Sequence, residues 1–270
     1  MKNELALHTW TLDTTPLAEV LRIAKRTGWA AVELRRVDFV RAHDAGTPAE
    51  EVLALVGASG LGVAAVGVEL GWMFATGQER ERLLQVFADS CRWARALGCA
   101  TVMSPVDRGR GPLDRAAASI REVSDLAGSH GVRLALEFNS QAEQFNTLGG
   151  MREALAAAGH AHVGLLLDTY HLQRSGAGVR DLEDVAPAEI AYFQYSDVPR
   201  SGLQAGLALD RLPPGQGCVP FREVFRFLES KGYGGYLSYE APNPAAWARD
   251  PEAVAREALE ATRRYLVATG

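Results

Sequence analysis

Short apolar runs alternate along this chain with longer stretches in which apolar residues recur at helical spacing. Several of the short runs are apolar at consecutive positions, which is typical of strands that are covered on both faces. We expect strands over residues 4–10, 31–35, 62–70, 101–105, 133–138, 163–169, 190–197 and 235–242. We expect helices between them, including residues 17–26, 49–56, 79–97, 113–127 and 251–268.

This β/α alternation predicts the fold class. Eight strands, each followed by a helix, indicate an α/β protein with a parallel sheet. The chain has 270 residues, and a closed (β/α)8 TIM barrel typically needs about 250. We therefore predict a TIM barrel as a single domain over residues 1–270. No G-x-G-x-x-G turn follows the first strand, which argues against an open dinucleotide-binding sheet.

Composition and charge narrow the function classes. The chain carries 28 Lys and Arg against 33 Asp and Glu, well mixed, with a formal charge of −5, so we expect no nucleic-acid partner. Its three cysteines form no C-x-x-C pair, which is typical of reduced thiols in a cytoplasmic protein. No run of 18 apolar residues occurs, so we expect no membrane partner. Barrels of this kind often pair, which makes a homodimer one assembly to test.

Polar side chains lie near the ends of the last four predicted strands. Glu137 lies near the end of the fifth strand, Asp168 near the end of the sixth and Glu240 near the end of the eighth, while Gln194 lies within the seventh. TIM barrels carry their chemistry at the C-terminal ends of their strands. Because alternate side chains of a strand face the same way, these four residues converge at the barrel mouth if their faces point inward.

This set of residue types predicts a metal site. Three carboxylates crowded in a largely apolar barrel would repel one another, and a divalent cation would offset that cost. The amide oxygen of Gln194 would be a neutral fourth ligand beside Glu137, Asp168 and Glu240. An all-oxygen set suits Mn²⁺, Mg²⁺ or Co²⁺ better than Zn²⁺. The alternative is that each residue is a separate polar group, held by backbone donors or by an arginine.

The motifs around these residues resemble those of the xylose isomerase-like TIM barrels. The matching stretches are LEFN, LLLDTYH, FQYSDVPR, RLPPGQG and GYGGYLSYE, and the resemblance covers nearly the whole chain. That family includes sugar and sugar-phosphate isomerases and epimerases, inosose dehydratase, 3-dehydroshikimate dehydratase and, more distantly, endonuclease IV. The resemblance implies that Glu137, Asp168, Gln194 and Glu240 bind one divalent metal ion.

Two features point to different branches of this family. Most of its isomerases and epimerases have histidine at the position of Gln194. Glutamine there, together with Arg211 in an R-x-P-x-G-x-G stretch, is similar to the 3-dehydroshikimate dehydratases. The stretch ELGWMFATGQERER after the third strand looks more like that of the sugar isomerases. Both branches therefore stay open.

One catalytic mechanism is common to the isomerase and dehydratase branches. A divalent ion that chelates adjacent hydroxyl and carbonyl oxygens acidifies the neighbouring C–H group and stabilises the enediolate that forms. The resemblance to the epimerases implies that Glu137 and Glu240 exchange protons with the substrate from opposite faces. If the next carbon carries a leaving hydroxyl group, the same intermediate expels water and the enzyme is a dehydratase.

Three residues are candidates for binding the substrate through polar groups. His171 follows Asp168 and could hydrogen-bond the substrate or act as an acid or base, or it could cap the next helix. Arg200 and Arg211 lie after the seventh strand and could clamp a carboxylate, a phosphate or an array of hydroxyl groups. The alternative for both arginines is a surface ion pair.

Aromatic residues near strand ends could form a wall for the substrate. His8 and Trp10 end the first strand and Trp72 follows the third, and aromatic faces pack well against C–H surfaces. The equal alternative is packing beneath a loop. Glu33 and Arg35 also approach a strand end, where a pairing with a neighbouring strand would be purely structural.

The residues and the resemblance favour a divalent-metal-dependent sugar or sugar-phosphate isomerase or epimerase that acts through an enediolate on a small polyhydroxylated carbonyl compound. A metal-dependent dehydratase of 3-dehydroshikimate or inosose is the alternative within the family. A catalytically inactive sugar-binding barrel is the alternative from another class. A nuclease like endonuclease IV would need a histidine-rich trinuclear site and a basic groove, which six histidines and the negative charge do not favour.

Overall fold

Eight parallel strands close into one barrel in chain order, and β8 is hydrogen-bonded back to β1. The computed structural model describes residues 2–201 and 208–266, and these strands all lie within them. The strands are β1 Leu5–His8, β2 Ala31–Leu34, β3 Gly62–Gly67, β4 Thr101–Pro105, β5 Arg133–Glu137, β6 Val163–Asp168, β7 Ile190–Tyr195 and β8 Leu237–Tyr239. This topology confirms the predicted α/β class and the (β/α)8 TIM barrel.

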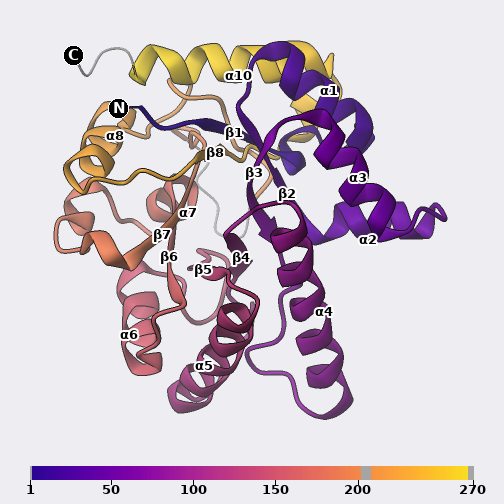
Figure 1. Ribbon diagram of the computed structural model, residues 1–270. Helices are drawn as coiled ribbons and strands as arrows, with labels where there is room; N and C mark the ends of the chain where they lie inside the picture. The colour runs from indigo at the N-terminus through magenta and orange to yellow at the C-terminus, as the bar shows by residue number, and fades with distance from the viewer. Residues whose placement is uncertain (1, 202–207, 267–270) are drawn as a thin grey trace.

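Helices surround the barrel on its outside (Figure 1). The longer helices are α1 Leu17–Thr27, α2 Arg36–Asp44, α3 Ala49–Ser59, α4 Gly77–Ala96, α5 Leu113–Ser129, α6 Leu148–Ala158, α8 Phe221–Ser230 and α10 Pro251–Leu266. Short helical segments occupy loops, namely η1 Thr9–Leu12, α7 Thr169–Arg174, η2 Val179–Leu182, η3 Pro187–Glu189 and α9 Pro244–Trp247. The last long helix, α10, packs beside α1 and completes the ring. In the described part of the chain, no helix is both long and apolar enough to cross a bilayer.

Seven of the eight strands are shorter than the sequence pattern predicts, and β4 has the predicted bounds. β1 ends at His8 because the chain turns at once into the 3₁₀ helix η1. β8 ends at Tyr239, so Glu240 is the first residue beyond it. Polar residues near the strand ends thus leave the sheet and form the loops of the barrel mouth. The five helices predicted by range are all present to within a few residues, and residues 267 and 268 of the last prediction lie outside the described residues.

Side chains inside the barrel change from apolar to polar within two residues along several strands. The lower layer includes Ala6, Ala31, Ala135, Leu166 and Tyr192. Two residues further along the same strands stand His8, Glu33, Glu137, Asp168 and Gln194. On β8, Ser238 is followed in the same way by Glu240. The pleat of the strands therefore delivers six polar side chains to the C-terminal end of the barrel.

The larger core lies between the barrel and its helices. Strand residues of the outward face, such as Leu7 and Leu136, pack there with helix residues such as Ile23 and Phe225, and all four are at most 1% exposed. Burial of a side chain of this size contributes about 1.5–3 kcal/mol. This apolar shell stabilises the barrel, so the polar mouth need not contribute to stability.

A buried aspartate organises the loop that follows β7. Asp197 is 0% exposed, and its carboxylate accepts four backbone N–H hydrogen bonds at 2.7–2.9 Å. The four donors belong to Val198, Gly215, Gly217 and Val219. A Cβ atom on Gly217 would lie 2.0 Å from a backbone carbonyl oxygen, so only glycine fits. Asp197 also pairs with Leu212 through two backbone hydrogen bonds, which fixes the neighbouring Arg211.

We expect Asp197→Asn to lower the free energy of unfolding by about 3 kcal/mol, because the new amide would place N–H donors against backbone N–H donors in a buried site. Urea denaturation followed by circular dichroism measures the loss. Asp250→Asn is the matched control, since Asp250 is exposed and caps α10 through Ala253, and asparagine caps equally well. The free energy of unfolding of Asp250→Asn should fall by less than about 0.5 kcal/mol. Equal losses in both variants would contradict the role given to Asp197.

Candidate active site

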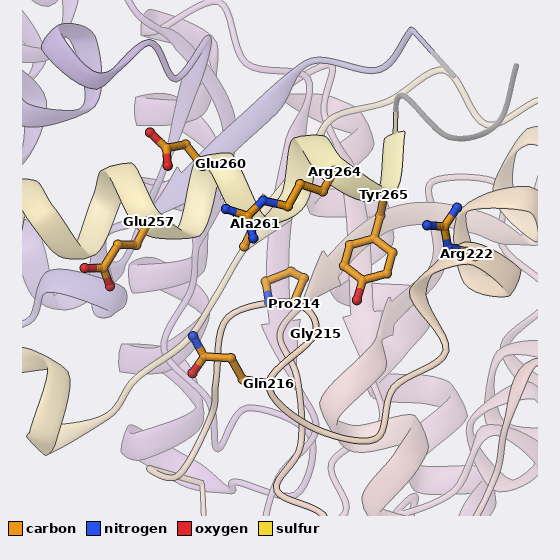
Figure 2. A pocket seen from close by; sticks show the side chains of 9 residues that line it. All are labelled: Pro214, Gly215, Gln216, Arg222, Glu257, Glu260, Ala261, Arg264 and Tyr265. Carbon is orange, nitrogen blue, oxygen red and sulfur yellow. The ribbon is translucent and has the colours of Figure 1, made fainter.

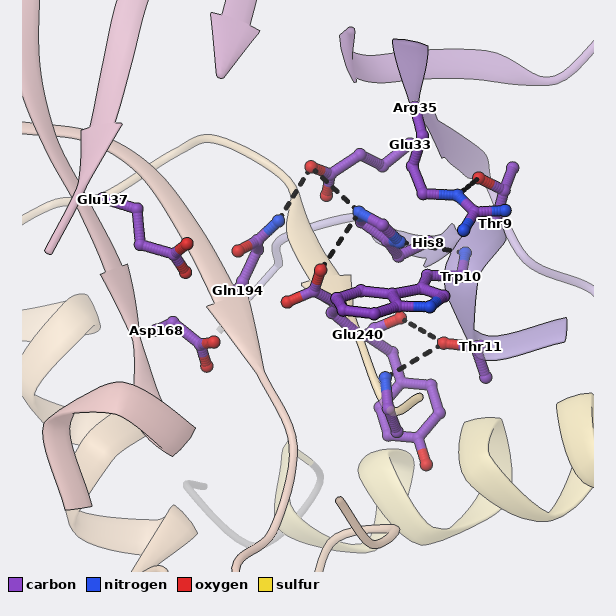
Figure 3. Close-up of polar contacts among 12 residues, drawn as sticks. His8, Thr9, Trp10, Thr11, Glu33, Arg35, Glu137, Asp168, Gln194 and Glu240 are labelled. Carbon is purple, nitrogen blue, oxygen red and sulfur yellow. Dashed lines mark hydrogen bonds and ion pairs between the residues drawn. The ribbon is translucent and has the colours of Figure 1, made fainter. Parts of the chain in front are cut away.

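A pocket of about 430 Å³ opens at the C-terminal ends of the strands. Its polar lining includes His8, Trp10, Glu137, His171, Arg211 and Glu240. Its apolar wall includes Val37, Val40, Val68, Leu70 and Met103. Asp168 and Gln194 are buried beside the polar lining, and Figure 3 shows both near Glu137 and Glu240. The structure therefore brings the four predicted metal ligands to one end of the barrel.

Arg211 carries positive charge into this cluster. Its Nη1 lies 2.6 Å from Asp168 Oδ2 and 2.8 Å from Glu240 Oε2, and the residue is 2% exposed. Burial alone would lower the pKa of Arg211, but Asp168, Glu240 and Glu137 raise it above its ordinary value. The guanidinium therefore stays protonated and offsets the charge of two carboxylates. Arg211 faces the site and does not form a surface ion pair.

His171 joins the same cluster from α7. Its Nε2 lies 3.8 Å from Glu137 Oε1 and 4.0 Å from Asp168 Oδ2, while Nδ1 lies 2.9 Å from Ser140 Oγ. Burial, and then the charge of Arg211, lower the pKa of His171 to about 3, so the ring is neutral. One ligand atom each from Glu137, Asp168 and His171 lie within 4.8 Å of one another. That spacing makes His171 a candidate metal ligand as well as a substrate-binding residue.

Two buried oxygen atoms of the cluster lack a hydrogen-bond partner among the residues that the structure describes. They are Glu137 Oε1 and Gln194 Oε1. Buried acceptors are nearly always satisfied in proteins, and a divalent cation would satisfy both of these. The residues therefore fit the predicted metal ion. Because a histidine nitrogen lies beside the oxygen atoms, the donor set suits Zn²⁺ as well as Mn²⁺ and Co²⁺.

Burial perturbs the carboxyl groups of the mouth. It raises the pKa of Glu137 well above its ordinary value, and the charges of Asp168 and Glu240 add to this shift. Burial also raises the pKa of Glu240 to about 7, although Arg211 opposes the change. The pKa of Glu33 rises to about 8 because of burial and of the nearby Glu240. Carboxyl groups with pKa values near neutrality can take up and release protons under physiological conditions.

Glu33 belongs to this site, although the sequence pattern gave it a structural role. Gln194 Nε2 donates to Glu33 Oε1 at 2.8 Å, and the Tyr192 hydroxyl donates to Glu33 Oε2 at 3.0 Å. Figure 3 shows Glu33 between His8 and Gln194. Arg35 donates to Asp13 and Asp38, and it also lines the pocket.

His8 connects Glu33 to Glu240. Its Nδ1 accepts a hydrogen bond from the backbone N–H of Trp10 at 3.0 Å, so the ring proton lies on Nε2. That Nε2 lies 3.3 Å from Glu240 Oε1 and 3.6 Å from Glu33 Oε1. Burial, and then two nearby arginines, lower the pKa of His8 well below its ordinary value. The neutral ring therefore presents its Nε2–H beside the carboxyl groups of Glu240 and Glu33.

Two residues predicted to contact the substrate lie elsewhere. Trp72 is 0% exposed, its indole N–H donates to Ser104 Oγ at 3.0 Å, and its ring packs edge-on against Phe87. Trp72 is thus a core residue beneath the loop after β3, which corrects the prediction. Arg200 is exposed and is not among the described residues that line the pocket. Of the two predicted arginines, Arg211 is the one that reaches the site.

A second hollow of about 520 Å³ lies outside the barrel, between α10 and the loop that leads into α8 (Figure 2). Its charged lining residues are Arg222, Glu257, Glu260 and Arg264, and all four are exposed. Solvent screens such charges, so interactions among them are weaker than those among the buried groups of the mouth. The chemistry therefore belongs to the buried mouth.

Comparisons with known proteins agree with this geometry. A family model described as xylose isomerase-like TIM barrel matches residues 21–265. Inosose isomerase of Halalkalibacterium halodurans is 29% identical over 144 residues, which are 53% of this chain and 51% of that protein. The 3-dehydroshikimate dehydratase of Pseudomonas aeruginosa is 27% identical over 165 residues, which are 56% of this chain and 25% of that protein. The chain thus matches about half of the first relative's length and a quarter of the second's.

Among solved structures, the IOLI protein with a bound zinc atom superposes on this chain with a TM-score of 0.87. The two share 19% sequence identity, and the superposition covers 99% of each chain. At that identity the likeness shows the fold. Together the matches confirm the resemblance that the motifs predict.

The metal-free protein should lose stability as the pH rises. The pKa of Glu33, about 8, and that of Glu240, about 7, lie above the ordinary value of 4.5. Their contribution is fully present below that ordinary value and is lost as the pH rises through these folded-state values. We expect the melting temperature of chelator-treated protein to fall over this range, and added Mn²⁺ to raise it again at the alkaline end. Differential scanning calorimetry tests this, and a melting temperature that stays level or rises would contradict it.

Proposed function

Because this chain belongs to the xylose isomerase-like TIM barrel family, we propose that it is a divalent-metal-dependent isomerase or epimerase of a small polyhydroxylated carbonyl compound. Sugars, sugar phosphates and inososes are the substrate classes. One observation carries the proposal: three buried carboxylates and Gln194 converge at the mouth, with two oxygen atoms that have no partner in the described part of the chain. The match to an inosose isomerase supports it.

Glu137, Asp168, Gln194 and Glu240 would hold the ion, and His171 Nε2 is a further candidate ligand. When bound, the ion polarises the carbonyl oxygen of the substrate and acidifies the adjacent C–H group. Arg211 now contacts Asp168 and Glu240, so its guanidinium and the ion compete for the same oxygen atoms. If Arg211 releases one of these carboxylates, its free N–H groups can donate hydrogen bonds to oxygen atoms of the substrate.

Glu137 and Glu240 would move the proton. They come from the ends of β5 and β8, which β6 and β7 separate in the barrel, so their carboxylates reach the mouth from different sides. One can remove a proton from the substrate and the other can return it on the opposite face. Burial raises the pKa of both groups in the absence of a metal ion, whereas a bound cation would lower it and keep the carboxylates ionised, so that either can accept a proton. The Nε2–H of His8 keeps Glu240 oriented.

The remaining lining residues bind the substrate and exclude water. The ring of His171 lies beside Glu137 and Asp168 and can contact a hydroxyl group of the substrate. Trp10 and the apolar wall of the pocket cover C–H surfaces. Removal of water from the site strengthens the electrostatic interactions that stabilise a developing oxyanion.

A metal-dependent dehydratase is the second candidate. Gln194 at a position where the related isomerases have histidine, Arg211 in the stretch RLPPGQG, and the match to a 3-dehydroshikimate dehydratase favour it. The same carboxylates would serve, because a neighbouring carboxylic acid can protonate the departing hydroxyl group. Mass spectrometry of the product separates the two functions, since an isomerase conserves the mass and a dehydratase removes one water.

We expect Glu137→Gln and Glu240→Gln each to lower turnover by about 10³-fold or more, because each amide removes a proton-transferring group. The assay offers inososes, ketoses and 3-dehydroshikimate to the Mn²⁺-loaded protein and follows the products by chromatography. Glu143→Gln is the matched control, because Glu143 is exposed in the loop after β5 and should leave turnover unchanged.

Wild-type rates in both carboxylate variants would show that the active site is misplaced. A wild-type protein that binds Mn²⁺ but changes none of these compounds would favour the inactive sugar-binding barrel.

We expect Gln194→His to keep divalent-ion binding and to shift the preference toward Zn²⁺ by about tenfold, because imidazole favours this ion more than an amide oxygen does. Competitive titration of Mn²⁺ and Zn²⁺ into chelator-treated protein measures the ratio of dissociation constants. An unchanged ratio would count against Gln194 as a ligand.

A further inference from the structure

Gln194 and Glu33 form a buried pair across the inside of the barrel. Both are 0% exposed, and Gln194 Nε2 donates to Glu33 Oε1 at 2.8 Å. The nitrogen end of the Gln194 amide makes this contact, and the carboxyl oxygen of Glu33 accepts it. The oxygen end then points away from Glu33, and Figure 3 shows it on the side of Glu137 and Asp168.

We propose that Glu33 is a positioning residue that fixes the Gln194 amide with its oxygen toward the metal ligands. This inference rests on the proposed function, because it concerns the same metal site. The two ends of an amide are nearly equal in size, so packing alone does not choose between them. If the amide turned over, its N–H groups would face Glu137 and Asp168, and the nitrogen of an amide is not a metal ligand.

The position of Glu33 argues against a merely structural role. Glu33 lies on β2, which is not a neighbour of β7 in the barrel, so the contact with Gln194 crosses the interior. A buried carboxyl group costs stability, and an apolar side chain of similar volume would fill the same space at lower cost. Acceptance of the hydrogen bond from Gln194 explains why a carboxyl group is buried at this position.

Glu33 is itself held in place. The Tyr192 hydroxyl donates to its second oxygen at 3.0 Å, and His8 Nε2 lies 3.6 Å from the first. The same Nε2 lies 3.3 Å from Glu240 Oε1. A continuous set of contacts thus runs from Gln194 through Glu33 and His8 to Glu240, and it aligns two of the proposed ligands (Figure 3). Partners of this kind behind a metal ligand typically change metal affinity about 10–100-fold.

Mn²⁺ binding to chelator-treated protein, measured by isothermal titration calorimetry, tests the inference. Glu33→Met removes both acceptors but keeps a side chain of similar length, so we expect the dissociation constant for Mn²⁺ to rise about 10–100-fold. Glu33→Gln replaces the carboxyl group with an amide that keeps an acceptor for Gln194, and should retain the wild-type constant.

Unchanged affinity in Glu33→Met would overturn the inference. Equal weakening in Glu33→Met and Glu33→Gln would overturn it too, because the charge of Glu33 would then govern the affinity. If Glu33→Met does not fold, Glu33→Asp carries the same expectation of weaker binding, because its carboxylate is drawn back from Gln194 by one methylene group. A wild-type protein that binds no divalent ion would refute the proposed function itself, whereas tight wild-type binding with an insensitive Glu33→Met refutes this inference alone.

Discussion

Burying several carboxyl groups at one end of a barrel has an energetic cost that shapes the rest of the site. Glu33, Glu137, Asp168 and Glu240 are each at most 6% exposed. Two like charges about 4 Å apart repel by about 4 kcal/mol at an effective dielectric constant of about 20. Such a cluster persists only where positive charge and hydrogen-bond donors reach the same point. Arg211 supplies charge to two of the carboxylates, and the unpartnered oxygen atoms of Glu137 and Gln194 indicate where a divalent cation would supply more.

The barrel tolerates this cost because its stability comes from another part of the molecule. The apolar shell between strands and helices is extensive, and the lower layer of the barrel interior is apolar as well. Asp197 adds a rigid support for the loop that carries Arg211. The fold thus holds the arginine and the carboxylates in a fixed arrangement, and a substrate that enters the pocket meets groups that are already oriented.

The sequence predicted the parts of the site that depend on strand periodicity. Glu137, Asp168, Gln194 and Glu240 follow inward-facing positions by two residues, so their convergence could be derived from the pleat alone. Glu33 follows Ala31 in the same way, and this signal was present, but its partner lies on a strand that is not adjacent in the barrel. Contacts that cross the interior depend on side-chain length and packing, which periodicity does not encode.

Loop conformation is the second feature that the sequence pattern could not predict. Arg211 reaches the mouth because Asp197 binds the backbone of its loop, whereas Trp72, in the loop after β3, turns into the core and bonds to Ser104. The pattern of polar and apolar residues around these two side chains does not predict either outcome. Strand ends were overestimated for a related reason, since the chain enters loops and 3₁₀ turns while it is still apolar.

Anomalous diffraction from a crystal grown with Mn²⁺, recorded at the manganese absorption edge, shows whether the barrel mouth holds a metal ion. We expect one strong peak within ligand distance of Glu137, Asp168, Glu240 and the amide oxygen of Gln194, with Arg211 no longer bridging Asp168 and Glu240. A crystal without a peak at the barrel mouth, in which Arg211 still spans both carboxylates, would contradict it.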